Sequence, residues 1–326
     1  MPSHSMVLMQ GARDATLEVW DTTEIGQPRH ICTILSAQWG RFFSSLSVGF
    51  SSGGSLGEGQ LSLTGEIKPI GQTTAYPGLG AFNYDGTFAY ESGSLDGTAT
   101  FHIFREGVDH AILTFPPIGS HGGAPWGPTQ QMQFSSDGQY VLDFNIFRQG
   151  AGPPAFIVFR RDGSIAFQSA TAEFGTWSLY GNKLYFLVPD RVAGVGGVIH
   201  SWDPVAGDVA LTRMSSYFWP AMSLDGEWIA YTAYSPADSC GGLPHIWRLD
   251  LDTLQTSQLV SGLSSHPVFA GRAVWFNQEI PVQCGPGGES SRNGVVVSHD
   301  IDTRAETEIE VEGGTQFWAD VWIIRD

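Results

Sequence analysis

Lysine is nearly absent from this chain, which has only Lys68 and Lys183 among its 326 residues. Lysine and arginine together number 16 against 33 aspartates and glutamates, so the formal net charge is −17. A surface this anionic repels phosphate backbones, and we therefore expect no nucleic-acid binding. This charge has two interpretations. The first is that it serves solubility, and the alternative is that it forms a surface that binds cations or cationic partners.

Long apolar runs are missing as well. No stretch of about 18 apolar residues occurs, so we expect no transmembrane span. The N-terminal segment MPSHSMVLMQ has no basic region followed by an apolar core, and we expect that this chain carries no signal peptide. Apolar residues do not recur with a 3.6-residue period, which predicts little or no helix.

Several motifs of enzymes and metal proteins are also lacking. The chain has no HExxH or CxxC pair and no Asp-rich calcium loop, so no metal site and no cofactor are predicted from motifs. It has no GxSxG, and the glycine-rich AGVGGV lacks the strand and helix that a phosphate-binding loop requires.

What the chain does have is a repeated phrase in which a tight glycine turn precedes an aromatic-rich strand. Its turn glycines are separated by 46, 52, 43, 45 and 45 residues, a period that suits four-stranded propeller blades. The clear copies are AFNYDGTFAYES (81–92), QFSSDGQYVLDF (133–144) and AMSLDGEWIAYT (221–232), and the looser ones are SLYGNKLYFLV (178–188), VFAGRAVWFN (268–277) and AQWGRFFSSLS (37–47).

A second kind of hairpin alternates with these phrases and occurs seven times, as in FIVFRRDGSIAFQ (156–168). We therefore predict one all-β domain over residues 1–326, a closed β-propeller of four-stranded antiparallel blades. Seven blades are expected, or six if one hairpin is overcounted. Strands from the two ends, such as MVLMQ (6–10) and TQFWADVWIIRD (315–326), would complete the last blade and close the ring. Whether the C-terminus supplies one strand or two stays open.

The phrases SSDGQYVLDF and SLDGEWIAYT, together with second hairpins such as LDLDTLQTSQLV, resemble TolB-type, WD-like propeller repeats over nearly the whole chain. The resemblance implies the propeller architecture. TolB proteins are periplasmic and carry a second domain, for which this chain has no room, so their function is not implied.

The three cysteines divide into two groups. Cys32 lies in an apolar strand and is expected to be a small buried hydrophobe. Cys240 and Cys284 lie in corresponding loops of consecutive blades, on one face, which could bring them within reach of a disulfide. The alternative is two free loop thiols. A disulfide would imply an oxidising compartment, periplasmic or secreted.

Long loops gather on one face of the predicted propeller, which we call the loop-rich face. They comprise the links between blades and the connections from each second strand to the third, and loops on a rigid scaffold are where binding residues concentrate. Aromatic and histidine side chains on the links could ring the channel mouth and bind a ligand, or could fill the mouth and join the blades; they are Tyr76, His121, Trp126, Tyr217, Trp219, His266 and Trp318.

The other histidines have a different expected role. His102, His200, His245 and His299 are predicted on strands as hydrogen-bonded structural residues. A metal site would instead combine His121 and His266 with Asp190, Asp238 or Glu279, and a cation in the channel stays open.

Two functions follow from these expectations. The leading hypothesis is a monomeric propeller outside the cytoplasm that binds a small molecule, glycan or protein at its loop-rich face. The alternative is a carbohydrate lyase or hydrolase in which His121 or His266 acts as acid or base.

Overall fold

The computed structural model contains strands and turns, and no helix occurs among the residues that it describes. No helix in those segments is long and apolar enough to cross a membrane. The described residues are 4–11, 17–21, 27–34, 38–44, 47–52, 55–61, 67–73, 77–83, 85, 87–93, 98–106, 108–116, 131–145, 154–178, 182–190, 196–214, 220–222, 226–235, 243–270, 273–281, 291–309 and 316–324.

The described strands form seven four-stranded antiparallel sheets, a number compatible with the seven predicted blades. They fall into two compact units, unit 1 (Met1–Gly53, Glu58–Ile70 and Ser215–Asp326) and unit 2 (Gly54–Gly57 and Gly71–Met214). The prediction of a single domain is not tested by this division.

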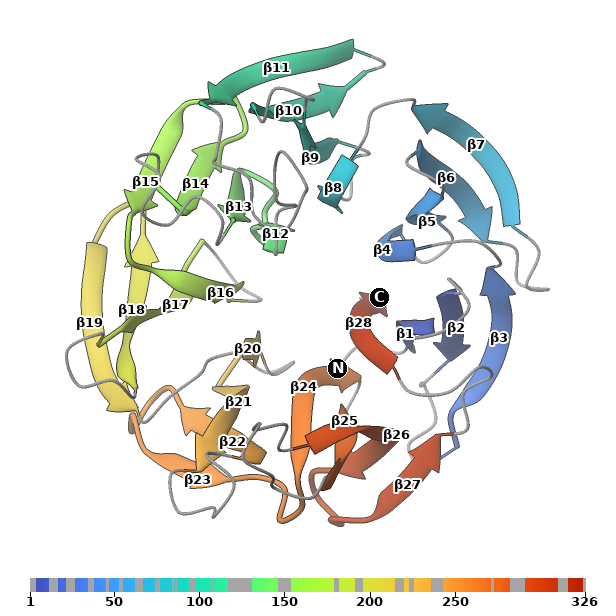
Figure 1. Ribbon diagram of the computed structural model, residues 1–326, viewed down its shortest axis with the longest axis vertical. Coiled ribbons are helices and arrows are strands. Elements are labelled where there is room, and N and C mark those ends of the chain that lie inside the picture. The colour runs from blue at the N-terminus through green and yellow to red at the C-terminus, as the bar shows by residue number, and fades with distance from the viewer. Residues whose placement is uncertain are drawn as a thin grey trace, which may run out of the picture. The chain divides into compact units, whose positions relative to one another are not determined.

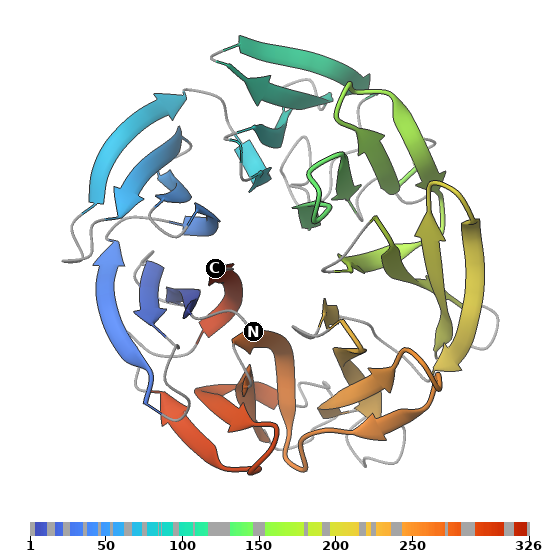
Figure 2. The ribbon, with the colours of Figure 1, turned by 180° about the vertical axis from the view of Figure 1, so that it is seen from behind.

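Unit 2 holds three sheets, which lie side by side in chain order (Figures 1 and 2). Their strands are β8 (Pro77–Phe82), β9 (Phe88–Gly93), β10 (Ala99–Arg105) and β11 (Val108–Phe115); β12 (Gln131–Phe134), β13 (Tyr140–Phe144), β14 (Phe156–Arg160) and β15 (Ile165–Ser169); and β16 (Glu173–Trp177), β17 (Leu184–Pro189), β18 (Gly197–Asp203) and β19 (Gly207–Met214).

Unit 1 holds the other sheets, with part of the β4–β7 sheet assigned to unit 2. Their strands are β20 (Pro220–Met222), β21 (Trp228–Ser235), β22 (Leu243–Asp250) and β23 (Thr256–Gln258); β24 (Ser264–Ala270), β25 (Ala273–Pro281), β26 (Ser291–Asp300) and β27 (Glu306–Ile309); β28 (Gln316–Ile324), β1 (His4–Gly11), β2 (Leu17–Asp21) and β3 (Arg29–Ile34); and β4 (Gln38–Ser44), β5 (Ser47–Ser52), β6 (Ser55–Leu61) and β7 (Ile67–Thr73).

One sheet of unit 1 is built from both ends of the chain, as the sequence predicted. The C-terminal strand β28 pairs antiparallel with β1, from His4 opposite Ile324 to Gly11 opposite Gln316. The C-terminus supplies one strand and the N-terminal segment supplies three, in the order β28-β1-β2-β3. This answers the question that the sequence left open.

The predicted glycine turn between β12 and β13 shows why the repeated phrase needs glycine. Gly138 has φ = 68°, a backbone conformation that side chains with a Cβ rarely adopt. A Cβ there would also overlap the side chain of Asn83 in the preceding sheet. Arg161 strengthens this end of unit 2 because its guanidinium pairs with the carboxylate of Asp85.

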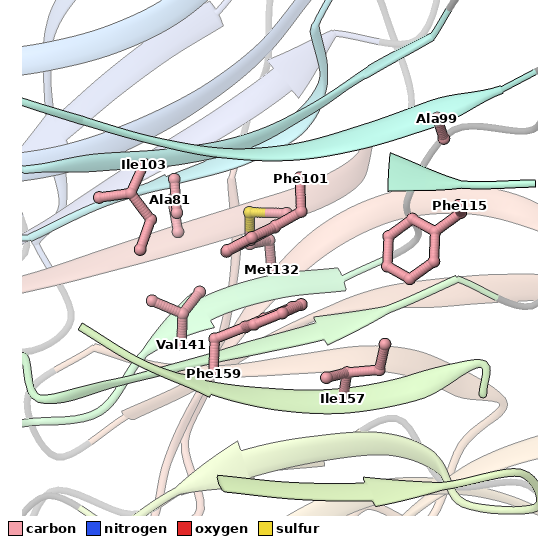
Figure 3. Close-up of a cluster of buried hydrophobic side chains, with 10 residues drawn as sticks. Ala81, Ala99, Phe101, Ile103, Phe115, Met132, Val141, Ile157 and Phe159 are labelled. Carbon is pink, nitrogen blue, oxygen red and sulfur yellow. The ribbon is translucent and has the colours of Figure 1, made fainter. Parts of the chain in front are cut away.

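The core of unit 2 lies between facing sheets (Figure 3). Phe101 of β10 stacks on Phe159 of β14 with ring centroids 4.0 Å apart and planes 5° from parallel. Met132 lies beside them, and all three side chains are fully buried. Burial of one phenylalanine contributes about 2–3 kcal/mol relative to leaving it exposed, so contacts of this kind join neighbouring sheets.

Polar contacts also join the sheets of unit 2. The side-chain amide of Gln131 in β12 donates to the carbonyl oxygen of Gly175 in β16 at 2.6 Å and accepts from the Gly175 N–H at 2.8 Å. The indole of Trp177 donates to the carbonyl oxygen of Gln133 at 3.0 Å. These bonds fix the first strands of two neighbouring sheets against each other.

Candidate functional site

His266 is the predicted binding residue whose side chain the structure describes. Trp318 is placed by its backbone in β28, and Glu279 by its backbone in β25. Asp190 is also described. The other residues proposed for binding, for a disulfide or for a metal site lie outside the described residues; they are Tyr76, His121, Trp126, Tyr217, Trp219, Cys240, Cys284 and Asp238.

His266 lies on an irregular part of β24, the first strand of its sheet. The pairing of β24 with β25 shifts register between Ser265 and Val268, which makes this a β-bulge or similar irregularity. His266 has φ = 55°, in the left-handed region that a non-glycine residue enters only at a cost of about 1–3 kcal/mol. Bulges and strained residues are concentrated at functional sites, where they direct a side chain.

The surroundings of His266 are polar although they are buried. Its backbone N–H donates to Thr232 Oγ1 of β21 at 3.0 Å, and its Nδ1 lies 2.9 Å from Ser265 Oγ. Thr232 and Ser265 are both buried, with 3% and 4% of their surface exposed. Hydroxyl groups such as these both donate and accept hydrogen bonds.

Burial lowers the pKa of the His266 imidazole to about 4 from its ordinary value of 6.5. The physical cause is desolvation, which disfavours the charged imidazolium. His266 is therefore neutral at pH 7. A neutral imidazole accepts a proton or a hydrogen bond, but it does not supply the proton that a general acid must donate.

Unit 2 has a buried polar pair that the sequence analysis did not single out. Asn145, just after β13, donates from Nδ2 to Glu91 Oε2 of β9 at 3.0 Å, and neither residue has exposed surface. Asp143 of β13 is equally buried. The sequence contains one signal for them, because each of the apolar strands FAYES and YVLDF includes a carboxylate residue. The pair joins two sheets at the strand ends that lead into the loops between second and third strands.

The strand histidines have hydrogen-bond partners, as predicted. His200 Nδ1 lies 2.7 Å from Asp208, His299 Nδ1 lies 3.2 Å from Glu306, and His245 Nδ1 lies 3.2 Å from the carbonyl oxygen of Gly262. His102 contacts Ser92 and Asp109. These partners lie within the sheet of each histidine or in the link that follows it.

Asp190, predicted as a metal ligand, forms an ion pair with Arg213 at 3.3 Å in unit 2. Within the described segments, no group of three or more histidine, cysteine, aspartate or glutamate residues could hold a metal ion. Cys32 is free and partly buried, and burial raises the pKa of its thiol to about 11, so it is a poor nucleophile at neutral pH.

Comparison with known proteins identifies the fold. No protein-family model and no curated protein sequence matches this chain. Among solved structures, the periplasmic gluconolactonase of Pseudomonas aeruginosa has a TM-score of 0.62 at 12% identity and is matched over 99% of both chains. Oligogalacturonate lyase of Vibrio parahaemolyticus has a TM-score of 0.59 at 11% identity, with 85% of this chain and 89% of that one covered.

TolB of Acinetobacter baumannii has a TM-score of 0.51 at 14% identity, with 98% of this chain covered. This chain spans 66% of the length of that TolB chain. At these identities the likeness concerns the fold alone, and proteins that share this fold have different activities. The chain has the β-propeller fold of the TolB-like and WD-like structures that its repeated hairpins resemble.

Proposed function

We propose that this propeller binds a small, hydroxyl-rich ligand at its loop-rich face and that His266 contacts this ligand. The observation that carries the proposal is His266 itself, a strained residue on an irregular strand, in contact with the buried hydroxyls of Thr232 and Ser265. Sugar hydroxyls donate and accept hydrogen bonds in the way that such a set of side chains requires.

An enzyme acting on a sugar derivative is the second candidate. It is supported by the similarity of this fold to a gluconolactonase and an oligogalacturonate lyase. In that case His266 serves as a general base, because its lowered pKa of about 4 leaves it unprotonated at neutral pH. The general acid would then be another residue.

Binding should be measured by isothermal titration calorimetry with a panel of monosaccharides, aldonolactones and oligogalacturonates. We expect at least one of these compounds to bind, and His266→Ala to weaken its binding at least about tenfold, the equivalent of 1.4 kcal/mol. His110→Ala, which removes an exposed histidine of β11, should leave the Kd unchanged. No binding by any compound, or equal binding by the two variants, would contradict the proposal.

Turnover distinguishes the two candidates. The same compounds are incubated with the protein, and products are followed by mass spectrometry. A ligand that binds and is recovered unchanged supports the binding protein. Products that disappear with His266→Ala support the enzyme, whereas turnover unaffected by this variant would remove His266 from the mechanism.

The proposed location is outside the cytoplasm, with Cys240 and Cys284 joined in a disulfide. The segments that carry them connect β21 to β22 and β25 to β26, which are second and third strands of neighbouring sheets in unit 1. Alkylation without reductant, followed by mass spectrometry, should modify neither cysteine. Modification of both would refute the disulfide and remove this support for an oxidising compartment.

A further inference from the structure

Three side chains of unit 2 form a continuous hydrogen-bonded line across one sheet. Ser92 Oγ of β9 lies 2.8 Å from His102 Nε2 of β10. His102 Nδ1 lies 3.1 Å from Oδ2 and 3.2 Å from Oδ1 of Asp109 in β11. A hydroxyl on one imidazole nitrogen and a carboxylate on the other is the arrangement by which serine is activated as a nucleophile.

A fourth side chain holds this line in place. The ring of Tyr90 stacks on the imidazole of His102, with centroids 4.6 Å apart and planes 9° from parallel. The Tyr90 hydroxyl donates to Asp109 Oδ2 at 3.0 Å. Asp109 and Tyr90 therefore fix the orientation of the imidazole, so that Nε2 stays directed at Ser92.

The β16–β19 sheet shows which of these side chains recur in another sheet and which occur in the β8–β11 sheet alone of the two. There, His200 of β18 pairs with Phe186 in the register that joins His102 to Tyr90, and its Nδ1 contacts Asp208 at 2.7 Å. Val188 stands two residues beyond Phe186, where the β8–β11 sheet has Ser92. The histidine and aspartate are thus shared framework, and the serine hydroxyl is added in one sheet.

Ser92 lies near the end of its strand. It is the penultimate residue of β9, the second strand of its sheet. Ser92 is partly exposed, and the side chains of His102 and Asp109 are 13% and 42% exposed. The Ser92 hydroxyl is therefore partly accessible, and the contacts of Tyr90 and Asp109 orient the imidazole beside it.

We propose that Ser92, His102 and Asp109 form an acyl-transfer site that hydrolyses small carboxylic esters, independent of His266. Ser92 Oγ attacks the carbonyl carbon while its proton passes to His102 Nε2. Collapse of the adduct breaks the ester bond, and the leaving alkoxide takes that proton. Water, deprotonated by His102, then releases the carboxylic acid and restores the Ser92 hydroxyl. Ser92 and His102 are the catalytic residues, and Asp109 is a positioning residue.

The test is covalent labelling of the full chain with a fluorophosphonate, which reacts with activated serines. Intact mass should show one adduct, and peptide mapping should place it on Ser92. Ser92→Ala should abolish it, whereas Ser164→Ala, which removes an exposed turn hydroxyl, should not. No adduct on the wild-type protein, or an adduct that survives Ser92→Ala, would overturn the proposal.

Two further readouts separate catalysis from a structural hydrogen bond. Asp109→Asn should slow both labelling and p-nitrophenyl acetate hydrolysis by at least about 100-fold, because the imidazole loses the carboxylate that orients it. A network that only stabilises the sheet would change the unfolding midpoint and leave the labelling rate unaltered. Labelling reports on Ser92 and ligand titration reports on His266, so this proposal can fail while the ligand-binding proposal stands.

Discussion

His266 combines a strained backbone with a buried imidazole side chain. Burial of a neutral imidazole makes stability depend on pH. The His266 side chain is protonated near pH 6.5 in the unfolded chain, but only near pH 4 in the folded protein. The stabilisation is complete above pH 6.5 and is lost as the pH falls toward 4.

The expected size of this effect follows from the two pKa values of His266, 6.5 unfolded and about 4 folded. Between pH 6.5 and 4 the free energy of unfolding should fall by about 3 kcal/mol through this residue. In His266→Gln, which cannot titrate, that part of the pH dependence should vanish. Urea unfolding of both proteins at several pH values measures the difference, and a difference that does not change with pH would contradict the burial of a neutral histidine.

Gly138 allows a residue-scale test of the repeated turn. Gly138→Ala should destabilise the protein by at least about 2 kcal/mol, since it adds left-handed strain and a clash with Asn83. Gly207→Ala is the matched control because Gly207 has φ = 73° with nothing within 4 Å of the added Cβ, so only the strain of about 1 kcal/mol remains. Equal losses in urea unfolding would show that the Asn83 contact is unimportant.

At the scale of elements, aspartate explains the recurring second hairpin. Asp203 Oδ1 accepts from the backbone N–H groups of Val205 and Ala206, at 2.8 and 2.6 Å. Asp250 and Asp300 accept in the same way in their own turns. The side chain closes the turn that reverses the chain between the third and fourth strands.

These bonds favour the carboxylate, so the hydrogen bonds from Ala206 and Val205 hold the pKa of Asp203 below its usual value. Asp203→Ala should therefore lower stability at pH 7. The difference from wild type should disappear as the pH falls through the lowered pKa, because protonation removes the same interaction. Asp252→Ala, in the turn of the β20–β23 sheet, serves as the control. A loss that persists unchanged in strong acid would contradict this explanation.

The sequence predicted these hairpins because their signals are local. Asp-Gly turns and alternating apolar residues act between near neighbours, and they placed strands such as β13 and β21 correctly. The Ser92–His102–Asp109 line was not predicted, because it depends on register across three strands. Glu91 and Asn145 meet across two sheets, a contact that spacing along the chain cannot show. The irregularity of β24 at His266 has a local signal in Pro267, because proline interrupts a strand ladder, but the left-handed backbone of His266 does not follow from it.

At the scale of the whole molecule, the sheet β28-β1-β2-β3 depends on both chain ends. Truncation before β28 removes the ladder along one side of β1, and we expect loss of cooperative unfolding in urea. A circular permutant that links the ends and opens the chain at the exposed Val205 turn keeps every strand pair, and it should unfold like the wild-type protein. A stable truncated protein would contradict this role of β28.

The pairing of β28 with β1 also sets the order in which the protein can assemble during synthesis. β1 precedes β2 to β27 along the chain, whereas β28, its partner on one side, follows them. The sheets made of consecutive strands can form as they emerge from the ribosome. The sheet that holds β1 stays incomplete until β28 is made, so one edge of β1 is open to premature strand pairing while the strands between them are translated.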